Sequence, residues 1–237
     1  MGVKLHQRYF NAEGVRLPGT TTLTGNLGWN TRVLMAWAVK ETLAGNDYTK
    51  VRDKAGNAGT LLHKKIENVF LREKTDVSEF TKNEIKLATN SFKSFRYWKK
   101  DKQFQKITDT NGLKRYLLEE QFVSEIHQFG GTPDWYGLYR RKGEKDYKLT
   151  LLDWKSGNGI YAESIVQVAG GYTILLGENG YPVDRVILLN IPKTKGDSFI
   201  EKEVPIEVII KCQEIMKYLS VIHSNKKTID KYLKGRL

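Results

Sequence analysis

The chain has 237 residues, of which 40% are hydrophobic and 28% charged, a composition typical of a folded globular protein. Its single cysteine, Cys212, excludes an internal disulfide and any four-cysteine zinc or iron–sulfur site, and no apolar run approaches the roughly 18 residues of a membrane span. The 39 lysines and arginines exceed the 27 acidic residues, and the net charge of +12 favours a polyanionic partner, chiefly nucleic acid. We expect a cytoplasmic protein.

The first part of the chain is predicted to be mostly helical. Apolar residues recur at three- and four-residue spacing over residues 30–46 and again over residues 59–74. A third helix is predicted over residues 81–100, where Thr81 and Glu84 form the sequence pattern of a capping box.

The middle of the chain changes to the alternation typical of strands. Residues 114–126 and 129–141 are predicted to be two strands, and residues 145–157 a third. Because alternate residues of a strand share a face, Asp153 and Lys155 should lie on the same side of the third strand.

The last part of the chain returns to helix and strand in turn. We expect a helix over residues 163–180, a buried strand over 184–193 and an edge strand over 199–205. A long helix is predicted from Pro205, followed by a basic tail.

The order helix, three strands, helix, strand predicts an α/β fold around a mixed sheet. No internal repeat or low-complexity tract divides the sequence, so we expect one domain over residues 1–237. Within it we expect a helical N-terminal extension (1–60), a core (60–190) and a C-terminal helix with its basic tail (205–237).

Three charged residues at the strand ends are candidates for chemistry. Asp153 and Lys155 follow Leu151–Leu152, and a carboxylate can hold a hard divalent cation while the ammonium orients or helps to deprotonate a water. The alternative is an exposed salt bridge at the end of a strand. Asp134 lies 19 residues earlier, and on an adjacent antiparallel strand it could face the same Mg²⁺; alternatively it is a turn aspartate.

Two helical pairs extend this candidate site. His63 and Glu67 are four residues apart and share a helix face, and imidazole suits Mn²⁺ better than Mg²⁺. The alternative is a solvent-facing polar pair. Gln167 and Tyr172 lie on the helix after the third strand, where the alternative is an exposed amide and a half-buried aromatic ring.

A further cluster could bind nucleic acid. The segment "FRYWKKDK" interleaves Arg96, Trp98 and Lys99, and Arg140–Lys142 follow the second strand. Such clusters can follow a phosphate backbone and stack on bases. A solvated helix face and a solvated hairpin turn are the alternatives.

These residues together resemble the PD-(D/E)XK nuclease superfamily, in particular its RecB-like branch, which includes phage exonucleases, the CRISPR-adaptation nucleases and the mitochondrial genome maintenance exonuclease. The similarity runs from about Leu17 to about Leu189. It includes the opening "RLPGTTTLTGNLGWN…LMAWA" and four motifs: the helical pair His63 and Glu67, the "GTPD" that ends in Asp134, the "LLDWKSG" with Asp153 and Lys155, and the "QVAGGY" with Gln167 and Tyr172.

The resemblance implies a restriction-endonuclease-like core of order α-β-β-β-α-β. It also implies phosphodiester hydrolysis with Mg²⁺ or Mn²⁺. The ligands would be His63, Asp134, Asp153 and the carbonyl of Trp154, with Glu67 binding directly or through water. Lys155 would position or activate the attacking water.

Gln167 and Tyr172 would orient the nucleic acid, although the chain departs from the family by placing four residues between them instead of three. Gly170–Gly171 would permit a local bulge that restores the shared face. The lone cysteine departs from the iron–sulfur members, so no cluster is expected.

The favoured function is a DNA exonuclease acting on single strands or DNA ends in phage-type recombination or repair, in the host cytoplasm if the gene is of phage origin. A recombinase or single-strand annealing protein is a possible partner, and no membrane is expected. A structure-specific endonuclease on the same fold, or a nucleic-acid-binding protein without catalysis, are the alternatives.

Overall fold

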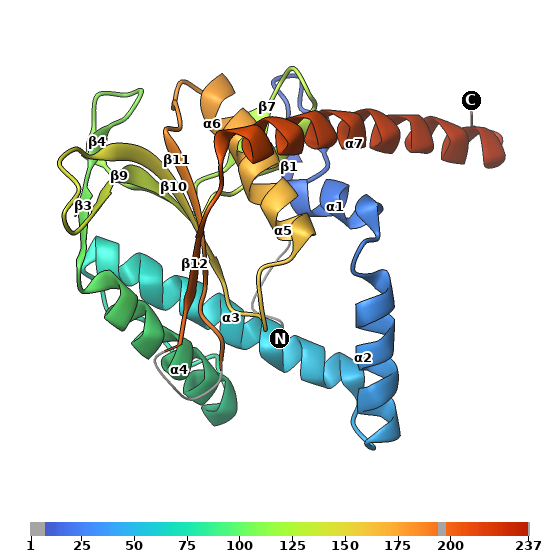
Figure 1. Ribbon diagram of the computed structural model, residues 1–237. Coiled ribbons are helices and arrows are strands. Elements are labelled where there is room, and N and C mark those ends of the chain that lie inside the picture. The colour runs from blue at the N-terminus through green and yellow to red at the C-terminus, as the bar shows by residue number, and fades with distance from the viewer. Residues whose placement is uncertain (1–7, 194–197, 237) are drawn as a thin grey trace.

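A mixed β-sheet with helices against both faces forms the centre of the protein (Figure 1). The computed structural model describes residues 8–193 and 198–236. The strands follow the order β12–β11–β10–β9–β3, with β6 also paired to β9. Only β10 and β11 are parallel, and every other pair in this sheet is antiparallel. The strand bounds are β3 Lys102–Gln105, β6 Leu117–Leu118, β9 Trp135–Arg141, β10 Lys148–Lys155, β11 Arg185–Asn190 and β12 Ile200–Glu203.

One face of the sheet packs against two helices, α3 (Tyr48–Leu71) and α4 (Lys82–Lys99), which lie side by side and run in the same direction. Leu62 and Ile66 of α3 and Phe95 of α4 are fully buried there. They pack in one core with the strand residues that face this side of the sheet, such as Leu152. Removing these side chains from water supplies the main stabilisation of this layer, at about 1.5–3 kcal/mol for each fully buried large side chain.

The other face packs against a helical crossover and the C-terminal helix. The crossover consists of α5 (Ala162–Ile165), the π-helical segment η2 (Val166–Tyr172) and α6 (Thr173–Glu178), and α7 (Ile206–Leu233) lies against it. Leu151, Leu175, Leu188 and Met216, each fully buried, belong to this second core. A crossover of this length is what the parallel pairing of β10 with β11 requires.

The N-terminal region contains a two-stranded β1–β2 sheet and three short or projecting helices. Their bounds are β1 Tyr9–Phe10, β2 Arg16–Leu17, α1 Thr20–Thr24, η1 Gly25–Leu27 and α2 Thr31–Leu43. β1 contacts the small β7–β8 sheet (Phe122–Ser124 and Phe129–Gly131). Gly130 permits this approach, because a Cβ there would lie 2.2 Å from the ring of Tyr9.

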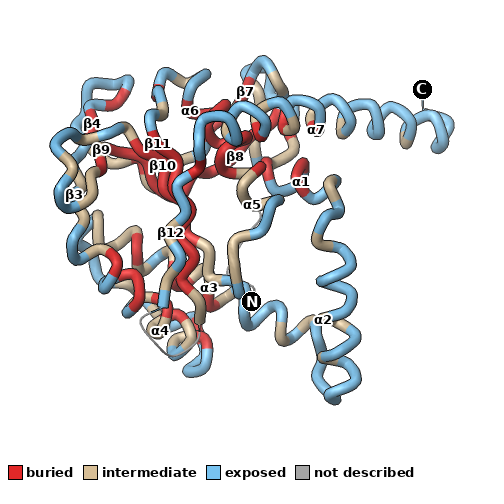
Figure 2. Tube along the Cα trace, viewed as in Figure 1, coloured by how far each residue is buried: buried red, intermediate tan, exposed pale blue. Residues whose placement is uncertain are grey.

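Two helices extend away from the body. None of the thirteen described residues of α2 is buried, and α7 has no buried residue among those described beyond Leu219. Figure 2 shows both segments as largely exposed, in contrast to the buried centre of the sheet.

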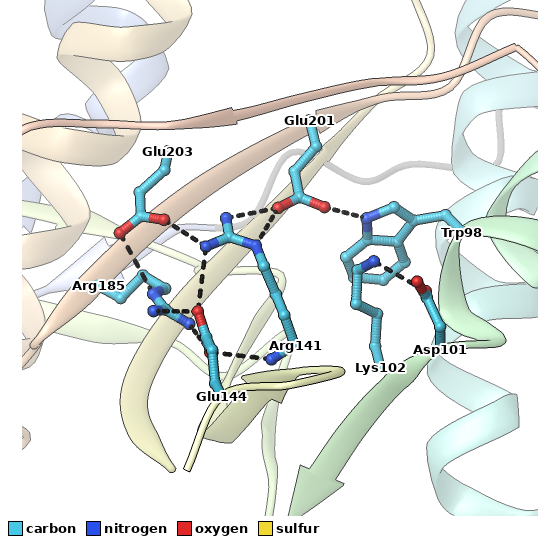
Figure 3. Close-up of polar contacts among 8 residues, drawn as sticks. All are labelled: Trp98, Asp101, Lys102, Arg141, Glu144, Arg185, Glu201 and Glu203. Carbon is cyan, nitrogen blue, oxygen red and sulfur yellow. Dashed lines mark hydrogen bonds and ion pairs between the residues drawn. The ribbon is translucent and has the colours of Figure 1, made fainter. Parts of the chain in front are cut away.

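A network of ion pairs connects the edge strand β12 to the rest of the sheet (Figure 3). Arg141 lies 2.5 Å from Glu201 and 2.7 Å from Glu203, and Arg185 lies 2.8 Å from Glu144 and 3.3 Å from Glu203. Because Arg185 is only 4% exposed, these carboxylates are needed to compensate its buried charge.

The predicted helices over residues 30–46 and 81–100 are confirmed, including the capping box of Thr81 and Glu84. The helix predicted over 59–74 instead begins at Tyr48, because Asp47 accepts hydrogen bonds from the first-turn amides and the added turns are too polar to show an apolar stripe. The extension expected over 1–60 therefore shares this helix with the core and also contains β1 and β2.

The continuous strand predicted over residues 114–126 is wrong. The segment is divided into β5 (Lys114–Arg115), β6 and β7, and Glu119 has a positive φ of 47° between the last two. β5 pairs with β4 (Ile107–Thr108) in a separate two-stranded sheet, which, like β3, the sequence reading did not anticipate.

The strands predicted over 129–141, 145–157, 184–193 and 199–205 are present with shorter bounds. The chain is therefore a mixed α/β protein with a central mixed sheet and helices at both ends. In the part of the chain that the structure describes, no helix combines the length and apolar character of a membrane span.

Candidate metal centre

Residues from distant parts of the chain meet in one pocket of about 720 Å³ at the end of the sheet. The pocket is bounded by α3, the start of β9, the end of β10, η2 and the N-terminal segment, with α7 at its edge. Six residues singled out in the sequence line it: His63, Asp134, Asp153, Lys155, Gln167 and Tyr172.

The pairing of β9 with β10 brings the two aspartates together. Leu152 pairs with Trp135 in this antiparallel ladder, so continuing the register by one residue places Asp134 opposite Asp153. The amide of Trp154 donates a hydrogen bond of 2.7 Å to Asp134 Oδ2, which fixes that carboxylate against β10. Both aspartates are buried, at 8% and 1% exposed.

His63, Glu119 and Asp134 form a group whose ligating atoms all lie within 4.8 Å of one another. His63 Nδ1 lies 3.0 Å from Glu119 Oε1 and 3.4 Å from Asp134 Oδ1. One imidazole nitrogen and two carboxylates are a donor set that suits Mn²⁺, and the carboxylates also suit Mg²⁺.

Glu119 is the member of this group that the sequence reasoning missed. Its carboxylate reaches the site because the chain turns there with φ of 47°, and its amide donates a 3.3 Å hydrogen bond to the carbonyl of Asp134. The only signal in the sequence is the acidic pair in "LLEEQ", since two carboxylates after an apolar pair interrupt a strand pattern.

The charges around His63, Glu119 and Asp134 favour the binding of a cation. Burial alone would lower the pKa of His63, but the carboxylates of Asp134 and Glu119 outweigh burial and raise that pKa to about 10. Burial opposes ionisation of Asp134, whereas His63 and then Lys155 stabilise its anion, so the pKa of Asp134 is lowered. The imidazolium thus supplies the positive charge that a bound cation would otherwise provide.

Asp153 and Lys155 form a second charged pair in the same pocket. Lys155 Nζ lies 2.7 Å from Asp153 Oδ2, and the pair comes from one face of β10. Burial and the neighbouring Asp134 raise the pKa of Asp153 to about 7, although Lys155 opposes this shift. The pKa of Lys155 is raised because Asp153 and Asp134 together outweigh its burial.

Gln167 and Tyr172 are brought together by the π-helical segment η2. The wider π turn places Gln167 Nε2 2.7 Å from the hydroxyl of Tyr172, so the bulge predicted at Gly170–Gly171 is present. Lys155 Nζ donates to Gln167 Oε1 at 3.4 Å, which connects this pair to the charged residues of β10.

Glu67 lies outside the three-residue group. It is on α3 one turn after His63 and lies near Glu119 and Asp134, with no space between them large enough for a water molecule. Burial and the charge of Glu119 raise the pKa of Glu67. Trp154 is held close to the site through its amide, while its indole packs in the core between the sheet and α3–α4.

The "FRYWKKDK" cluster does not line the pocket. Trp98 is 1% exposed, stacks on Tyr139 and donates to Glu201 at 2.6 Å, so its ring is not available to stack on bases (Figure 3). Lys99 packs 5.2 Å from the ring centre of Phe104, and Arg96 is exposed on α4. The prediction of a base-stacking surface at Trp98 is wrong, because the helix turns this ring toward the sheet.

The residues of the pocket fit a divalent cation. The group of His63, Glu119 and Asp134 offers three ligating atoms, and Asp153 adds a buried carboxylate. Apart from the ion pair with Lys155, neither oxygen of Asp153 has a hydrogen-bond partner among the described residues. Lys155 compensates Oδ2 of this buried carboxylate, and a bound cation would compensate Oδ1.

Comparison of the sequence with known proteins finds no family model that matches it and no curated protein that is similar to it.

Proposed function

We propose that the chain is a Mg²⁺- or Mn²⁺-dependent deoxyribonuclease that hydrolyses phosphodiester bonds. We further propose that it acts as an exonuclease on single-stranded DNA or DNA ends, in recombination or repair of the phage type. A cytoplasmic location and a recombinase or single-strand annealing partner belong to the same proposal.

The observation that supports this proposal best is convergence. His63, Asp134, Asp153, Lys155, Gln167 and Tyr172 come from four separate stretches of the sequence, and all six line one pocket. If each of these residues only stabilised its own helix or strand, we would not expect the fold to bring all six to one pocket. Perturbed pKa values of buried charged groups in a cleft are also typical of active sites.

The order of elements also supports it. α3, β9 and β10 are followed by the crossover of α5, η2 and α6 and then by β11, which pairs in parallel with β10. We propose that these elements constitute a restriction-endonuclease-like core. The positive net charge of +12 is favourable for a DNA substrate.

The metal site would be formed by His63, Glu119, Asp134 and Asp153 with the carbonyl of Trp154, and Glu67 would lie beside it. When bound, the divalent ion lowers the pKa of a water ligand and offsets charge on the phosphate. Asp134 is held for this role by the amide of Trp154 at 2.7 Å.

Lys155 would act on the attacking water. Its raised pKa keeps the side chain as an ammonium, so it donates hydrogen bonds and offsets phosphate charge instead of removing a proton. Gln167 accepts from Lys155 at 3.4 Å and donates to Tyr172 at 2.7 Å. These hydrogen bonds orient the ammonium, and Gln167 and Tyr172 both line the pocket that the strand would occupy.

The proposal is tested with end-labelled single- and double-stranded DNA incubated with Mg²⁺, Mn²⁺ or EDTA. We expect cleavage with either metal and none with EDTA, and we expect a closed circular single strand to stay intact. Cleavage of the circle would assign an endonuclease instead. DNA binding without cleavage under any divalent ion would contradict the enzymatic proposal.

Glu119 and Glu67 provide a matched pair for the metal site. Glu119→Gln removes a ligand and should weaken Mn²⁺ binding by about 100-fold, whereas Glu67→Gln should weaken it by less than about 10-fold. Isothermal titration with Mn²⁺ on the metal-free protein measures both. Equal effects, or a larger effect at Glu67, would show that the group within 4.8 Å is not the metal site.

A further inference from the structure

The lining of the pocket also includes basic residues that are not part of the metal site. His223 and Lys227 line the pocket together with Arg16 of β2. His223 and Lys227 are four residues apart, so they lie on the same face of the helix. Neither belongs to the sequence motifs or to the group of metal ligands.

The position of these residues follows from the path of α7. Leu219 is the last buried residue of the helix, and the hydroxyl of Ser220 bonds to the carbonyl of His127 on the body. The following turns leave the body and are largely exposed (Figure 2). His223 is half-buried. His223 and Lys227 thus lie on the first turns of the exposed second half of α7, beyond the part that packs on the body.

The two adjacent lysines differ in their partners. Lys226 lies 2.8 Å from Asp230, whereas no carboxylate of the described residues lies within ion-pair distance of Lys227. Burial and the charges of both lysines lower the pKa of His223, so this ring is neutral at pH 7 and offers an N–H donor. One unpaired ammonium and one neutral donor on a single face suit a phosphate group.

We propose that His223 and Lys227 form an anion-binding subsite that holds a non-scissile phosphate of the nucleic-acid strand whose scissile phosphate lies beside Lys155. This inference rests on the proposed nuclease function. The pocket is lined by the acidic residues of the metal site and by the cationic residues Arg16 and Lys227. A bound metal ion would compensate the acidic residues, and the phosphates of a nucleic-acid strand would compensate the cationic ones.

The test compares Lys227→Ala with Lys226→Ala, a change of equal charge one residue away that does not alter the pocket lining. Binding of a fluorescent single-stranded oligonucleotide is measured in EDTA at several salt concentrations. We expect Lys227→Ala to weaken binding by about 3- to 10-fold and to reduce the slope of log K against log salt by about 0.7. Lys226→Ala should change affinity by less than about 2-fold, and Lys227→Arg should bind like wild type.

Equal effects of Lys226→Ala and Lys227→Ala, or no effect of either, would overturn the inference. Cleavage by the same variants separates it from the proposed function. If wild type cleaves DNA with metal and Lys227→Ala binds like wild type, only the subsite is wrong. If wild type never cleaves but Lys227→Ala binds with the predicted loss, the anion subsite stands and the nuclease function is wrong.

Discussion

Replacing Gly170 with alanine should destabilise the protein, because this residue is where the π-helical segment packs against α7. A Cβ at Gly170 would lie 2.3 Å from the carbonyl oxygen and 2.7 Å from the carbonyl carbon of Cys212. Both atoms belong to the main chain of α7, so no side-chain rotation can relieve the contact. The two helices must separate by about 1 Å to reach an ordinary contact distance.

The expected cost can be worked from this geometry. Overpacking of this kind costs about 1–3 kcal/mol, and a main-chain obstacle places it toward the upper end. Alanine returns about 1 kcal/mol through its higher helix propensity. The net loss of about 2 kcal/mol corresponds to a fall of about 4–8 °C in Tm for a chain of this size.

Thermal unfolding of Gly170→Ala and of Gly56→Ala provides the measurement and its control. Gly56 lies within α3, and a Cβ there would meet no atom within 4 Å, so this variant should melt at or slightly above the wild-type temperature. A Gly170→Ala protein that melts as high as Gly56→Ala would refute the packing of η2 against α7.

Three further predictions follow from the same structure. Asn190→Leu removes the amide that donates to the carbonyls of Lys155, at the end of β10, and of Gly157, at 3.1 and 2.9 Å, and should cost about 1–3 kcal/mol in urea unfolding. The side-chain hydrogen bond from Arg185 is the main cause that lowers the pKa of Glu144 to about 2, below its unfolded value of 4.5. The ionised Glu144 therefore stabilises the fold fully above pH 4.5, and this stabilisation is lost as the pH falls toward 2. After allowance for solvent screening this is about 1–2 kcal/mol, and the stabilities of wild type and Glu144→Gln should converge at low pH in acid titrations of unfolding. Mn²⁺ at 100 times its Kd should raise the wild-type stability by about 2.7 kcal/mol, and the same Mn²⁺ concentration should leave the melting temperature of Asp134→Asn nearly unchanged.

Local sequence signals predicted the elements whose stability is local. The capping box of Thr81 and Glu84 marks the start of α4, and the apolar spacing after Pro205 marks α7, since these signals act within a turn or two of the chain. Tertiary contacts decided the rest. The segment around Glu119 alternates like a strand but bends, because its amide bonds to the carbonyl of Asp134 from another part of the chain.

The candidate site was predictable where strand alternation and helix spacing fix the direction of a side chain. Asp153 and Lys155 share a face of β10 for this reason, and His63 was placed on the helix that contacts the sheet. Glu119 was missed because only the bend directs it to the site. Trp98 was misassigned because its basic neighbours were given more weight than its helical spacing from Ala88 and Phe95, which places it on the buried face of α4.

The central claim is that one pocket holds a metal beside a lysine that acts on the attacking water. The most direct test is the rate of cleavage of an end-labelled single-stranded oligonucleotide in Mn²⁺ by wild type and by Lys155→Ala, with folding of both checked by circular dichroism. We predict metal-dependent cleavage by wild type and a loss of at least about 100-fold in Lys155→Ala. A folded Lys155→Ala protein that retains full metal-dependent cleavage would contradict this account.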